Sequence, residues 1–376
     1  MLTKDSSILI VGGGIFGLST AYHRAKAGYT KITMLEKGDA IPSPLSAGND
    51  LNKIVRAEYE DPFYAELALS AIEELGSNPL FAPHYSQVGY LLGNSAAAPE
   101  KSKRSLAKSM ASIERHPAFA TQITAINSRD DVHAVASALD GPMDEWTGYF
   151  NRLAGYARAA DALRSVYAAV KEMGVDVKLG RTAIIGQQIT AKSWLITHIQ
   201  LTPEEAAQLE GIPVTYSRDL GFFFEPDRKT GLLKISPSGA GFTNHQENGF
   251  SVPSERNDFI PPGEEEAVRK ILREHLPRFA DRPLVNSKIC WCADTADSEY
   301  IIDFVPGRLP WKDLAVATGD SGHAFKMFPV AGVMDLLEKG KQDVERWKWK
   351  EGSNAATAEV SWREGTTRDL SELVLS

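Results

Sequence analysis

The stretch Ser7-Ile-Leu-Ile-Val-Gly-Gly-Gly-Ile-Phe-Gly-Leu-Ser-Thr-Ala21 decides the fold of this chain. It begins with an apolar run rich in β-branched residues, which is typical of a buried parallel strand. Glycines follow at positions 12, 14 and 17, and the residues from Leu18 to Lys26 can continue as a helix. The G-x-G-x-x-G pattern therefore stands between a strand and a helix, which is the context that the motif requires.

Each glycine of the motif has a separate steric task. Gly12 allows the tight turn, Gly14 lets the backbone approach a pyrophosphate, and Gly17 lets helix and strand pack closely. The helix start after the turn offers free N–H groups and the positive end of its dipole to the phosphates, and we expect Ile15 and Phe16 to contact the cofactor there. The sequence therefore predicts a dinucleotide site.

A second strand supports this prediction. Residues 31–35 form an apolar run that ends on Glu36 and Lys37, and Glu36 is placed to accept a hydrogen bond from a ribose hydroxyl. The alternative, a glycine-rich turn in some other α/β protein, is less favoured because the strand, the helix and the acid all stand at the expected spacing. We expect an adenine dinucleotide here.

Composition bounds the remaining classes of function. The 376 residues suffice for two domains, and the net charge of −8 argues against a nucleic-acid partner. No apolar window is long enough to span a bilayer, and the first strand begins too early to leave room for a signal peptide. The two cysteines, Cys290 and Cys292, are poorly spaced for a disulfide and too few for a zinc site. We expect no metal and a reducing, intracellular compartment.

The chain after Glu36 continues as a loop at 39–50 and then reaches Lys53 and Arg56. On a helix these two cations would share a face and could serve anionic groups of a cofactor or a substrate. The alternative is a solvated basic face.

Further elements follow from hydrophobic periodicity and turn residues. Helices are expected at 62–75, within an exposed polar segment at 95–135, at 159–166, from 202 onward and at 329–337. Strands are expected at 85–92, 175–179, 196–201, 220–225, 231–235 and 314–318. The strand at 314–318 leads into a second glycine-bearing turn, which we expect to return to the cofactor.

Four separated blocks resemble one family. They are Ser46-Ala-Gly-Asn-Asp-Leu-Asn-Lys-Ile-Val-Arg56, His198-Ile-Gln-Leu-Thr-Pro-Glu-Glu205, Cys290-Trp-Cys-Ala-Asp-Thr-Ala-Asp297 and Thr318-Gly-Asp-Ser-Gly-His-Ala-Phe-Lys326. They are similar to fungal fructosyl amino acid oxidases (amadoriases), which belong with the FAD-dependent sarcosine and pipecolate oxidases, a D-amino acid oxidase-like family. The resemblance implies oxidation of a secondary amine to an imine, with O2 reduced to H2O2.

The resemblance also implies an α/β fold with two domains. A Rossmann-like FAD-binding domain would be discontinuous and comprise 1–60, 145–190 and 286–376. A smaller mixed β-sheet substrate domain would comprise 61–144 and 191–285.

The same resemblance assigns residue roles. Cys290 would bond covalently to the flavin, a reaction that cationic neighbours favour by lowering the thiol pKa, whereas Cys292 would be structural. Lys234 would lie over the flavin and assist oxygen reduction through its charge. Lys53 and Lys326 would lie near the substrate. Further FAD contacts would come from Ser46, Asn52, Lys53, Asp320, Gly322, His323, Phe325 and Lys326.

Substrate contacts would come from Arg56 and from Arg363, which falls roughly where the family has a carboxylate-binding arginine. Arg368 is the rival for that role.

Two departures from the family leave alternatives open. In Lys234-Ile-Ser-Pro-Ser238 a serine stands where the family has an acidic residue that contacts the sugar amine. The segment between Lys178-Leu-Gly180 and Ala191-Lys-Ser-Trp194 is shorter than in the family by a few tens of residues, so that Thr182 to Ile185 would have to replace a strand beside the cofactor. The alternatives are an oxidase of a saccharopine-like, pipecolate-like or secondary-metabolite amine, and a catalytically impaired relative that binds only a ligand or a partner. A nicotinamide enzyme is disfavoured by the block around Cys290.

The expected partners are a small-molecule amine and O2, with no nucleic acid and no membrane, and we expect a monomer. Glu372-Leu-Val-Leu-Ser376 lacks the Ser-Lys-Leu type of peroxisomal address, so the cytoplasm is the expected location.

Overall fold

The computed structural model describes residues 3–181, 189–306, 314–330, 336, 339–350 and 365–373. The described helices are α1 (Ile15–Lys26), α2 (Pro62–Ser77), α3 (Glu100–Glu114), α4 (Arg129–Val135), α5 (Ala159–Glu172), α6 (Pro203–Gln208) and α7 (Glu264–His275). The first strands are β1 (Ile8–Val11), β2 (Ile32–Leu35), β3 (Lys53–Val55), β4 (Tyr85–Ser86), β5 (Tyr90–Asn94), β6 (Ile123–Ile126), β7 (Thr147–Asn151), β8 (Gly155–Ala157) and β9 (Asp176–Lys178). The later strands are β10 (Thr190–Gln200), β11 (Val214–Ser217), β12 (Gly221–Phe223), β13 (Leu232–Pro237), β14 (Phe242–Thr243), β15 (Leu284–Asp294), β16 (Ile301–Phe304), β17 (Ala315–Thr318) and β18 (Arg368–Asp369).

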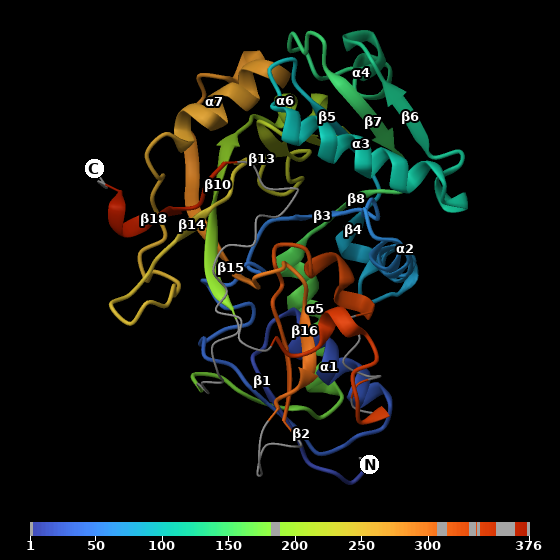
Figure 1. The fold of residues 1–376 in the computed structure, drawn as a ribbon, viewed down its shortest axis with the longest axis vertical. Coiled ribbons are helices and arrows are strands. Elements are labelled where there is room, and N and C mark those ends of the chain that lie inside the picture. Colours follow the sequence, from blue (N-terminus) through green and yellow to red (C-terminus); the bar gives the residue numbers. More distant parts are fainter. Residues whose placement is uncertain are drawn as a thin grey trace.

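A small parallel sheet carries the glycine motif at one end of the molecule (Figure 1). Its order is β1-β2-β9, with Ile8 opposite Ile32 and Thr33 opposite Asp176. Side chains of α1 and α5 share a core with one face of this sheet. The strand-turn-helix prediction for the first 26 residues is confirmed.

The prediction that β1 is buried on both faces is wrong. Ile10 packs in the core, whereas Leu9 and Val11, which point the other way, are 62% and 40% exposed. The physical reason is that α1 and α5 pack with the Ile10 face only, and within the described residues no helix covers the other face.

A ten-stranded mixed sheet dominates the other end. Its order is β18-β14-β10-β13-β12-β11-β5-β7-β6, and β15 pairs with β10 as well. The long antiparallel pair β10 and β15 runs toward the small sheet (Figure 1) and places Trp194 opposite Cys290. The predicted hairpin is confirmed as β12 and β13, in which Phe223 faces Ile235.

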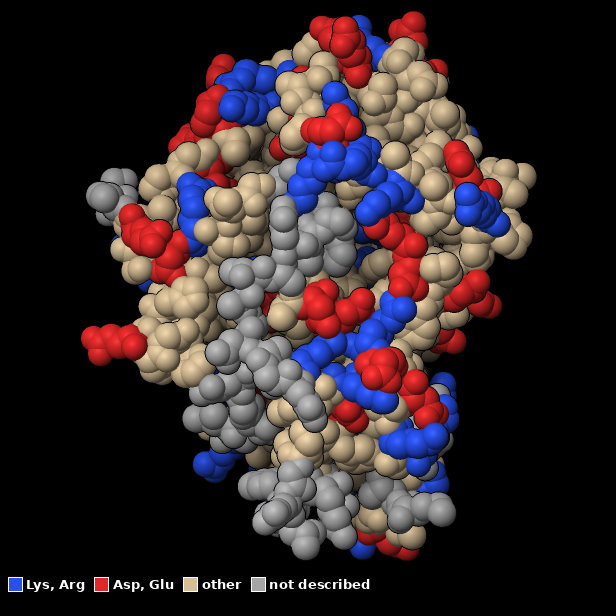
Figure 2. All heavy atoms as spheres, in the orientation of Figure 1, with Lys and Arg blue, Asp and Glu red and all other residues tan. Residues whose placement is uncertain are grey.

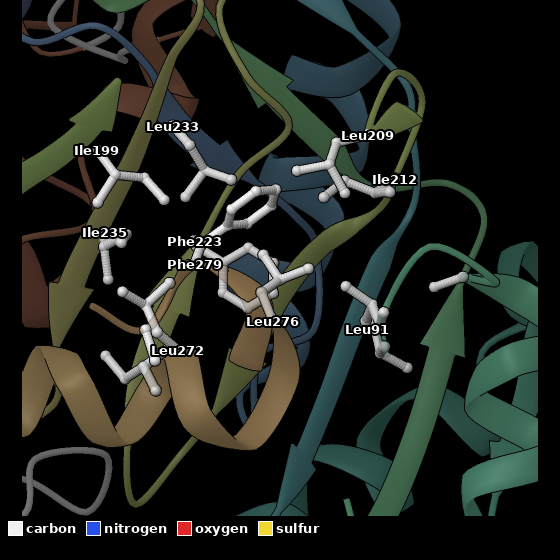
Figure 3. Packing of buried hydrophobic residues seen from close by; sticks show 14 of the residues in the cluster. Leu91, Ile199, Leu209, Ile212, Phe223, Leu233, Ile235, Leu272, Leu276 and Phe279 are labelled. Atoms are coloured by element: carbon white, nitrogen blue, oxygen red, sulfur yellow. The ribbon is translucent and has the colours of Figure 1, made fainter. Parts of the chain in front are cut away.

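Helix α7 covers one face of this large sheet. Figure 3 shows Leu272, Leu276 and Phe279 meeting Phe223 and Ile235 in a continuous apolar layer. Because each of these side chains is at least 98% buried, the layer fixes the position of β13, the strand that carries Lys234.

The helical interpretation of Leu51 to Arg56 is wrong. Residues 53–55 form β3, which pairs antiparallel with β8 so that Lys53 lies opposite Ala157. The backbone hydrogen bonds to β8 stabilise an extended conformation at residues 53–55 in place of a helix. Lys53 and Arg56 therefore do not share a helix face.

Most other elements agree with expectation. Helix α6 begins with the capping box predicted at Thr202 and Glu205. The expected strand at 85–92 is split into β4 and β5 at Gly89, whose φ is +86°. The segment 95–135 contains α3 and α4 but also the strand β6. Residues 325–330 form a 3₁₀ helix, and most of the helix expected at 329–337 lies outside the described residues.

The surface carries both signs of charge. On the face drawn in Figure 2, acidic and basic side chains are interspersed, so neither sign forms one continuous patch there. Within the described chain, no helix combines the length and the apolar character that crossing a bilayer needs. The domain boundaries expected from the sequence stay a prediction.

Candidate active site

The turn between β1 and α1 has the shape of a diphosphate cradle. Gly12 has a φ of +99°, which favours glycine, and a Cβ on Gly17 would lie 1.8 Å from the backbone oxygen of Gly12. A Cβ on Gly14 would meet no heavy atom within 4 Å, so the space beside Gly14 is open. In the described structure no side chain caps the start of α1 and its first turn has no acidic residue. The N–H groups there are available to an anion.

Glu36 stands at the carboxyl end of β2, beside this turn. Its Oε2 accepts a hydrogen bond from the backbone N–H of Gly13 at 2.7 Å, and its Oε1 accepts one from Gly38 at 2.8 Å. Two bonds do not exhaust the lone pairs of a carboxylate, so Glu36 can also accept a hydrogen bond from a ribose hydroxyl. Lys37, the next residue, is exposed.

Two of the predicted lysines meet at one carboxylate. Nζ of Lys234 lies 2.6 Å and Nζ of Lys53 lies 2.7 Å from Oδ2 of Asp50, and Lys234 also donates to the backbone oxygen of Asn52 at 2.7 Å. The Asp50 side chain is only 1% exposed. The cluster joins residues from β3, β13 and the loop before β3, so the fold itself assembles it.

Burial and charge set different proton affinities in this cluster. Burial alone would raise the pKa of Asp50, but the ammonium groups of Lys234 and Lys53 outweigh it and hold that pKa well below its ordinary value. Burial would lower the pKa of Lys53, but Asp50 and Cys290 raise it above the ordinary range. For Lys234 burial prevails over the attraction of Asp50 and lowers the pKa to about 8.

Cys290 lies on β15 with its Sγ 3.9 Å from Nζ of Lys53. The expected cation is thus present, yet burial raises the pKa of the thiol above its ordinary value and Lys53 only opposes this change. Cys292 stands two residues along the same strand, where alternation places it on the same side as Cys290, and it is buried. Ser46 bridges to Trp291 between them.

The second glycine-bearing turn reaches the first turn of α1. His323 stacks on Tyr300 with ring centroids 4.6 Å apart, and Phe16 of α1 contacts Tyr300 edge-on at 5.6 Å. Oδ1 of Asp320 accepts a hydrogen bond from the N–H of Gly322 at 2.9 Å, which fixes the turn. Tyr300 thus links this turn to the first turn of α1, and the expected contact of the turn with the cofactor stays a prediction.

Phe325 packs in the core that also contains α1 and Phe328, and its contact with the cofactor stays a prediction.

Arg56 and Lys326 lie together beside the aromatic ring of Tyr59. The Arg56 guanidinium donates to the backbone oxygen of Glu58 and lies 5.2 Å from the ring centroid of Tyr59. Nζ of Lys326 lies 5.4 Å from the same ring and donates to the backbone oxygen of His323 at 3.2 Å. Burial, and then the charge of Arg56, lower the pKa of Lys326 well below its ordinary value.

Of the two candidate arginines near the end of the chain, the structure describes Arg368. Arg363 lies outside the described residues. Arg368 lies on β18, at the edge of the large sheet, where it pairs with Glu264 of α7 at 2.5 Å. In this structure the guanidinium of Arg368 is therefore paired with the carboxylate of Glu264.

Comparison with known proteins places these features in a family. A family model described as FAD dependent oxidoreductase (DAO) matches residues 7–192. The crystal structure of the deglycating fructosamine oxidase Amadoriase II from Aspergillus fumigatus, in complex with FSA, is 30% identical, has a TM-score of 0.88, and is matched over 100% of this chain and 98% of that one. This chain belongs to the DAO family of FAD-dependent oxidoreductases.

Two further relatives of this FAD-dependent oxidoreductase inform the site. Fructosyl peptide oxidase from E. terrenum has a TM-score of 0.88 at 28% identity and is matched over 100% of this chain and 98% of its own. L-saccharopine oxidase from Schizosaccharomyces pombe is 29% identical over 429 positions, covering 95% of each chain. These positions exceed the 376 residues of the present chain, so the alignment opens gaps in it. Their placement at 180–191 stays a prediction, since residues 182–188 lie outside the described structure.

The residues present fit FAD, because the space beside Gly14 is open to a phosphate and the Glu36 carboxylate next to this turn can accept a further hydrogen bond. The most important residue that the sequence analysis missed is Asp50. It lies in the stretch from Ser46 to Arg56, where the neighbouring Ser, Gly and Asn residues are typical of a turn. A turn aspartate is normally solvated, so the sequence did not indicate that Asp50 is a buried counter-ion. Glu58, a buried carboxylate bonded to Asn151 at 2.6 Å, was missed as well.

Proposed function

We propose that the protein oxidises the secondary amine of an N-substituted amino acid, with FAD held covalently at Cys290 and O2 as the electron acceptor. The observation that supports this most is the meeting of Lys234, Lys53 and Cys290 around Asp50. Bound FAD supplies the acceptor for a hydride and the two electrons that reduce O2 to hydrogen peroxide. The protein residues supply position and charge.

Substrate binding falls to Arg56 and Lys326. Arg56 keeps its charge at all relevant pH values and can bind a carboxylate through two parallel hydrogen bonds. A secondary amine must lose its ammonium proton before a hydride can leave the neighbouring carbon. Burial and the charge of Arg56 lower the pKa of Lys326 well below its ordinary value, which favours the neutral amine, and we assign its Nζ as the acceptor of that proton.

Oxygen reduction falls to Lys234. Electron transfer to O2 creates an anion, and an ammonium held in a buried site stabilises that anion strongly because little water screens it. Lys234 is 2% exposed and fixed by two hydrogen bonds, so its charge is oriented before the reaction begins.

Covalent attachment falls to Cys290. The rise in thiol pKa caused by burial means that the thiolate must form with help from Lys53, whose Nζ is 3.9 Å away. Cys292 serves as the matched control, since it lies on the same strand.

A visible spectrum combined with a substrate panel tests the function. The purified protein should be yellow, and peroxide release should be measured with fructosyl-glycine, fructosyl-lysine, saccharopine, sarcosine and pipecolate. A colourless protein that FAD cannot reconstitute would contradict the proposal.

A saccharopine-type substrate is the second candidate. The stretch from Lys234 to Ser238 carries no acidic side chain to contact a sugar amine, and the Schizosaccharomyces pombe oxidase is 29% identical. Saccharopine and the fructosyl amino acids in the panel separate the two candidates by their relative kcat/KM.

A further inference from the structure

We propose that Asp50 is a positioning residue for oxygen reduction: its carboxylate fixes Nζ of Lys234 and keeps that amine protonated. The inference rests on the proposed function, because it gives Lys234 its task. It concerns a residue that makes no contact of its own with the reactants.

The first argument is geometric. Lys234 donates to Oδ2 of Asp50 and to the backbone oxygen of Asn52, at 2.6 and 2.7 Å. Within the described residues these are its hydrogen-bond acceptors, so the third N–H is left for a reactant. The ammonium also lies 5.0 Å from the ring centroid of Phe224, which limits its position on that side.

Asp50 is itself held by the backbone. Its Oδ1 accepts a hydrogen bond from the N–H of Leu51 at 2.8 Å, and its carbonyl oxygen accepts one from the N–H of Ala160 in the first turn of α5 at 3.1 Å. A carboxylate fixed in this way transmits its position to Lys234 rather than following the lysine.

The second argument concerns charge. The groups near Lys234 are Lys53 from β3, His198 opposite it on β10 and Cys290 from β15, and Lys288 acts on both His198 and Cys290. Burial and the neighbouring Lys234 lower the pKa of His198 to about 4, so it is neutral. Nζ of Lys288 donates to the backbone oxygen of Asn49 at 2.7 Å and brings a further positive charge. Asp50 is the anion among these groups, and without it the amines would repel each other and release protons.

A hollow of about 310 Å³ behind Asp50 supplies a matched control. Asp50, His198 and Lys288 line one side of this hollow, and Asp161 lines another. Asp161 pairs with Arg158 and Arg164 at 3.3 and 3.1 Å. Asp161→Asn therefore removes a carboxylate from the same hollow without touching Lys234.

The first measurement does not need flavin. Protein labelled with ¹⁵N-lysine, in its flavin-free form, is titrated by NMR, and the Lys234 signal is assigned by its loss in Lys234→Met. In the unmodified protein the signal should titrate near pH 8. In Asp50→Asn it should titrate at least one pH unit lower, so that the ammonium fraction at pH 8 falls about fivefold, from about a half to below about a tenth. Asp161→Asn should leave the titration in place, and an unshifted signal in Asp50→Asn would overturn the proposal.

The second measurement uses the flavin-loaded enzyme. In Asp50→Asn the rate of flavin reoxidation by O2 at pH 8 should be at least about fivefold lower than in the unmodified enzyme. As the pH rises, this rate should start to decrease at a lower pH than in the unmodified enzyme. Flavin reduction by the amine should change less than about twofold. Equal slowing of both half-reactions would indicate a merely structural role and overturn the proposal.

Asp50→Glu covers the case in which Asp50→Asn does not fold. It keeps the charge but moves the carboxylate by one methylene, so reoxidation should slow at every pH while the pH dependence stays in place. Unchanged rates would overturn the proposal. If no amine reduces the flavin of the unmodified enzyme, the proposed function fails. The NMR titration still decides whether Asp50 sets the pKa of Lys234.

Discussion

Replacing Gly17 and Gly14 by alanine separates helix packing from cofactor binding. Gly17 lies in α1, where a Cβ would stand 1.8 Å from the backbone oxygen of Gly12. Because that neighbour is backbone and not a flexible side chain, the strand-to-helix turn must move. A Cβ on Gly14 meets no heavy atom within 4 Å, and its backbone dihedral angles (φ −81°, ψ −164°) suit alanine. The two substitutions therefore add the same atom with opposite consequences.

The magnitudes follow from these two contacts. Overpacking costs about 1–3 kcal/mol, and the rigid contact puts Gly17→Ala at the upper end, about 3 kcal/mol. Alanine returns about 1 kcal/mol through its helix propensity, which leaves a loss of about 2 kcal/mol. At about 2–4 °C per kcal/mol for domains of 150–250 residues, the flavin-free protein should melt about 4–8 °C lower. Gly14→Ala should melt as the parent does.

Gly14→Ala should instead weaken FAD binding. The added methyl group occupies the space where the backbone approaches the phosphates. Hydrogen bonds to a charged group contribute about 1.5–3 kcal/mol, which corresponds to about a 10- to 100-fold increase in Kd. The titration is carried out in a Cys290→Ala background so that binding is reversible. The assignment of this turn to the cofactor would be refuted if Gly17→Ala had the melting temperature of the parent and Gly14→Ala had the same Kd for FAD as the parent.

Substitutions of Cys290, Lys234 and Lys326, with Cys292→Ala as a control, test the catalytic proposals. In Cys290→Ala the flavin should leave the polypeptide on acid precipitation, whereas in Cys292→Ala it should stay attached; the opposite pattern would move the linkage to Cys292. Lys234→Met should slow reoxidation by O2 by about 10²-fold or more while flavin reduction changes little, because it removes the oriented charge. In the unmodified enzyme the same reoxidation rate should fall as pH rises through about 8, where Lys234 loses its proton. Lys326→Met should slow flavin reduction by about 10²- to 10⁴-fold with little effect on reoxidation, and a selective loss of reoxidation would exclude Lys326 as the base.

Local chemistry made the dinucleotide turn predictable from the sequence. Gly12 and Gly17 have one steric requirement each, and both are visible in a linear pattern because the turn involves adjacent residues. The capping box at Thr202 and Glu205 was predictable for the same reason. Lys53 and Arg56 were assigned to a helix wrongly, because the ladder that makes β3 a strand comes from β8, about a hundred residues further along the chain.

The candidate site was predictable only through the family resemblance. Lys53, Lys234 and Cys290 lie in separate elements, and no periodicity relates positions that are 181 and 56 residues apart. The resemblance gave their identities but not their environment. Asp50 escaped notice because a buried counter-ion and a turn aspartate look alike in a sequence. The exposure of Leu9 and Val11 also escaped, since β-branched alternation does not tell whether a second layer covers the sheet.

Burial explains why two lysines that share one carboxylate differ in proton affinity. Their Nζ atoms lie at nearly the same distance from Oδ2 of Asp50, 2.6 Å for Lys234 and 2.7 Å for Lys53. The Lys53 side chain is 24% exposed, and the attractions of Asp50, Cys290 and Asp320 outweigh the burial that would lower its pKa. Lys234 is 2% exposed and has Lys53 itself as a positive neighbour, so its pKa falls to about 8. Lys53 is therefore a permanent cation, whereas Lys234 can give up and regain a proton near neutral pH. Lys234 can stabilise the anion formed from O2 only while it is protonated, so its proposed part in oxygen reduction depends on how far burial lowers its pKa.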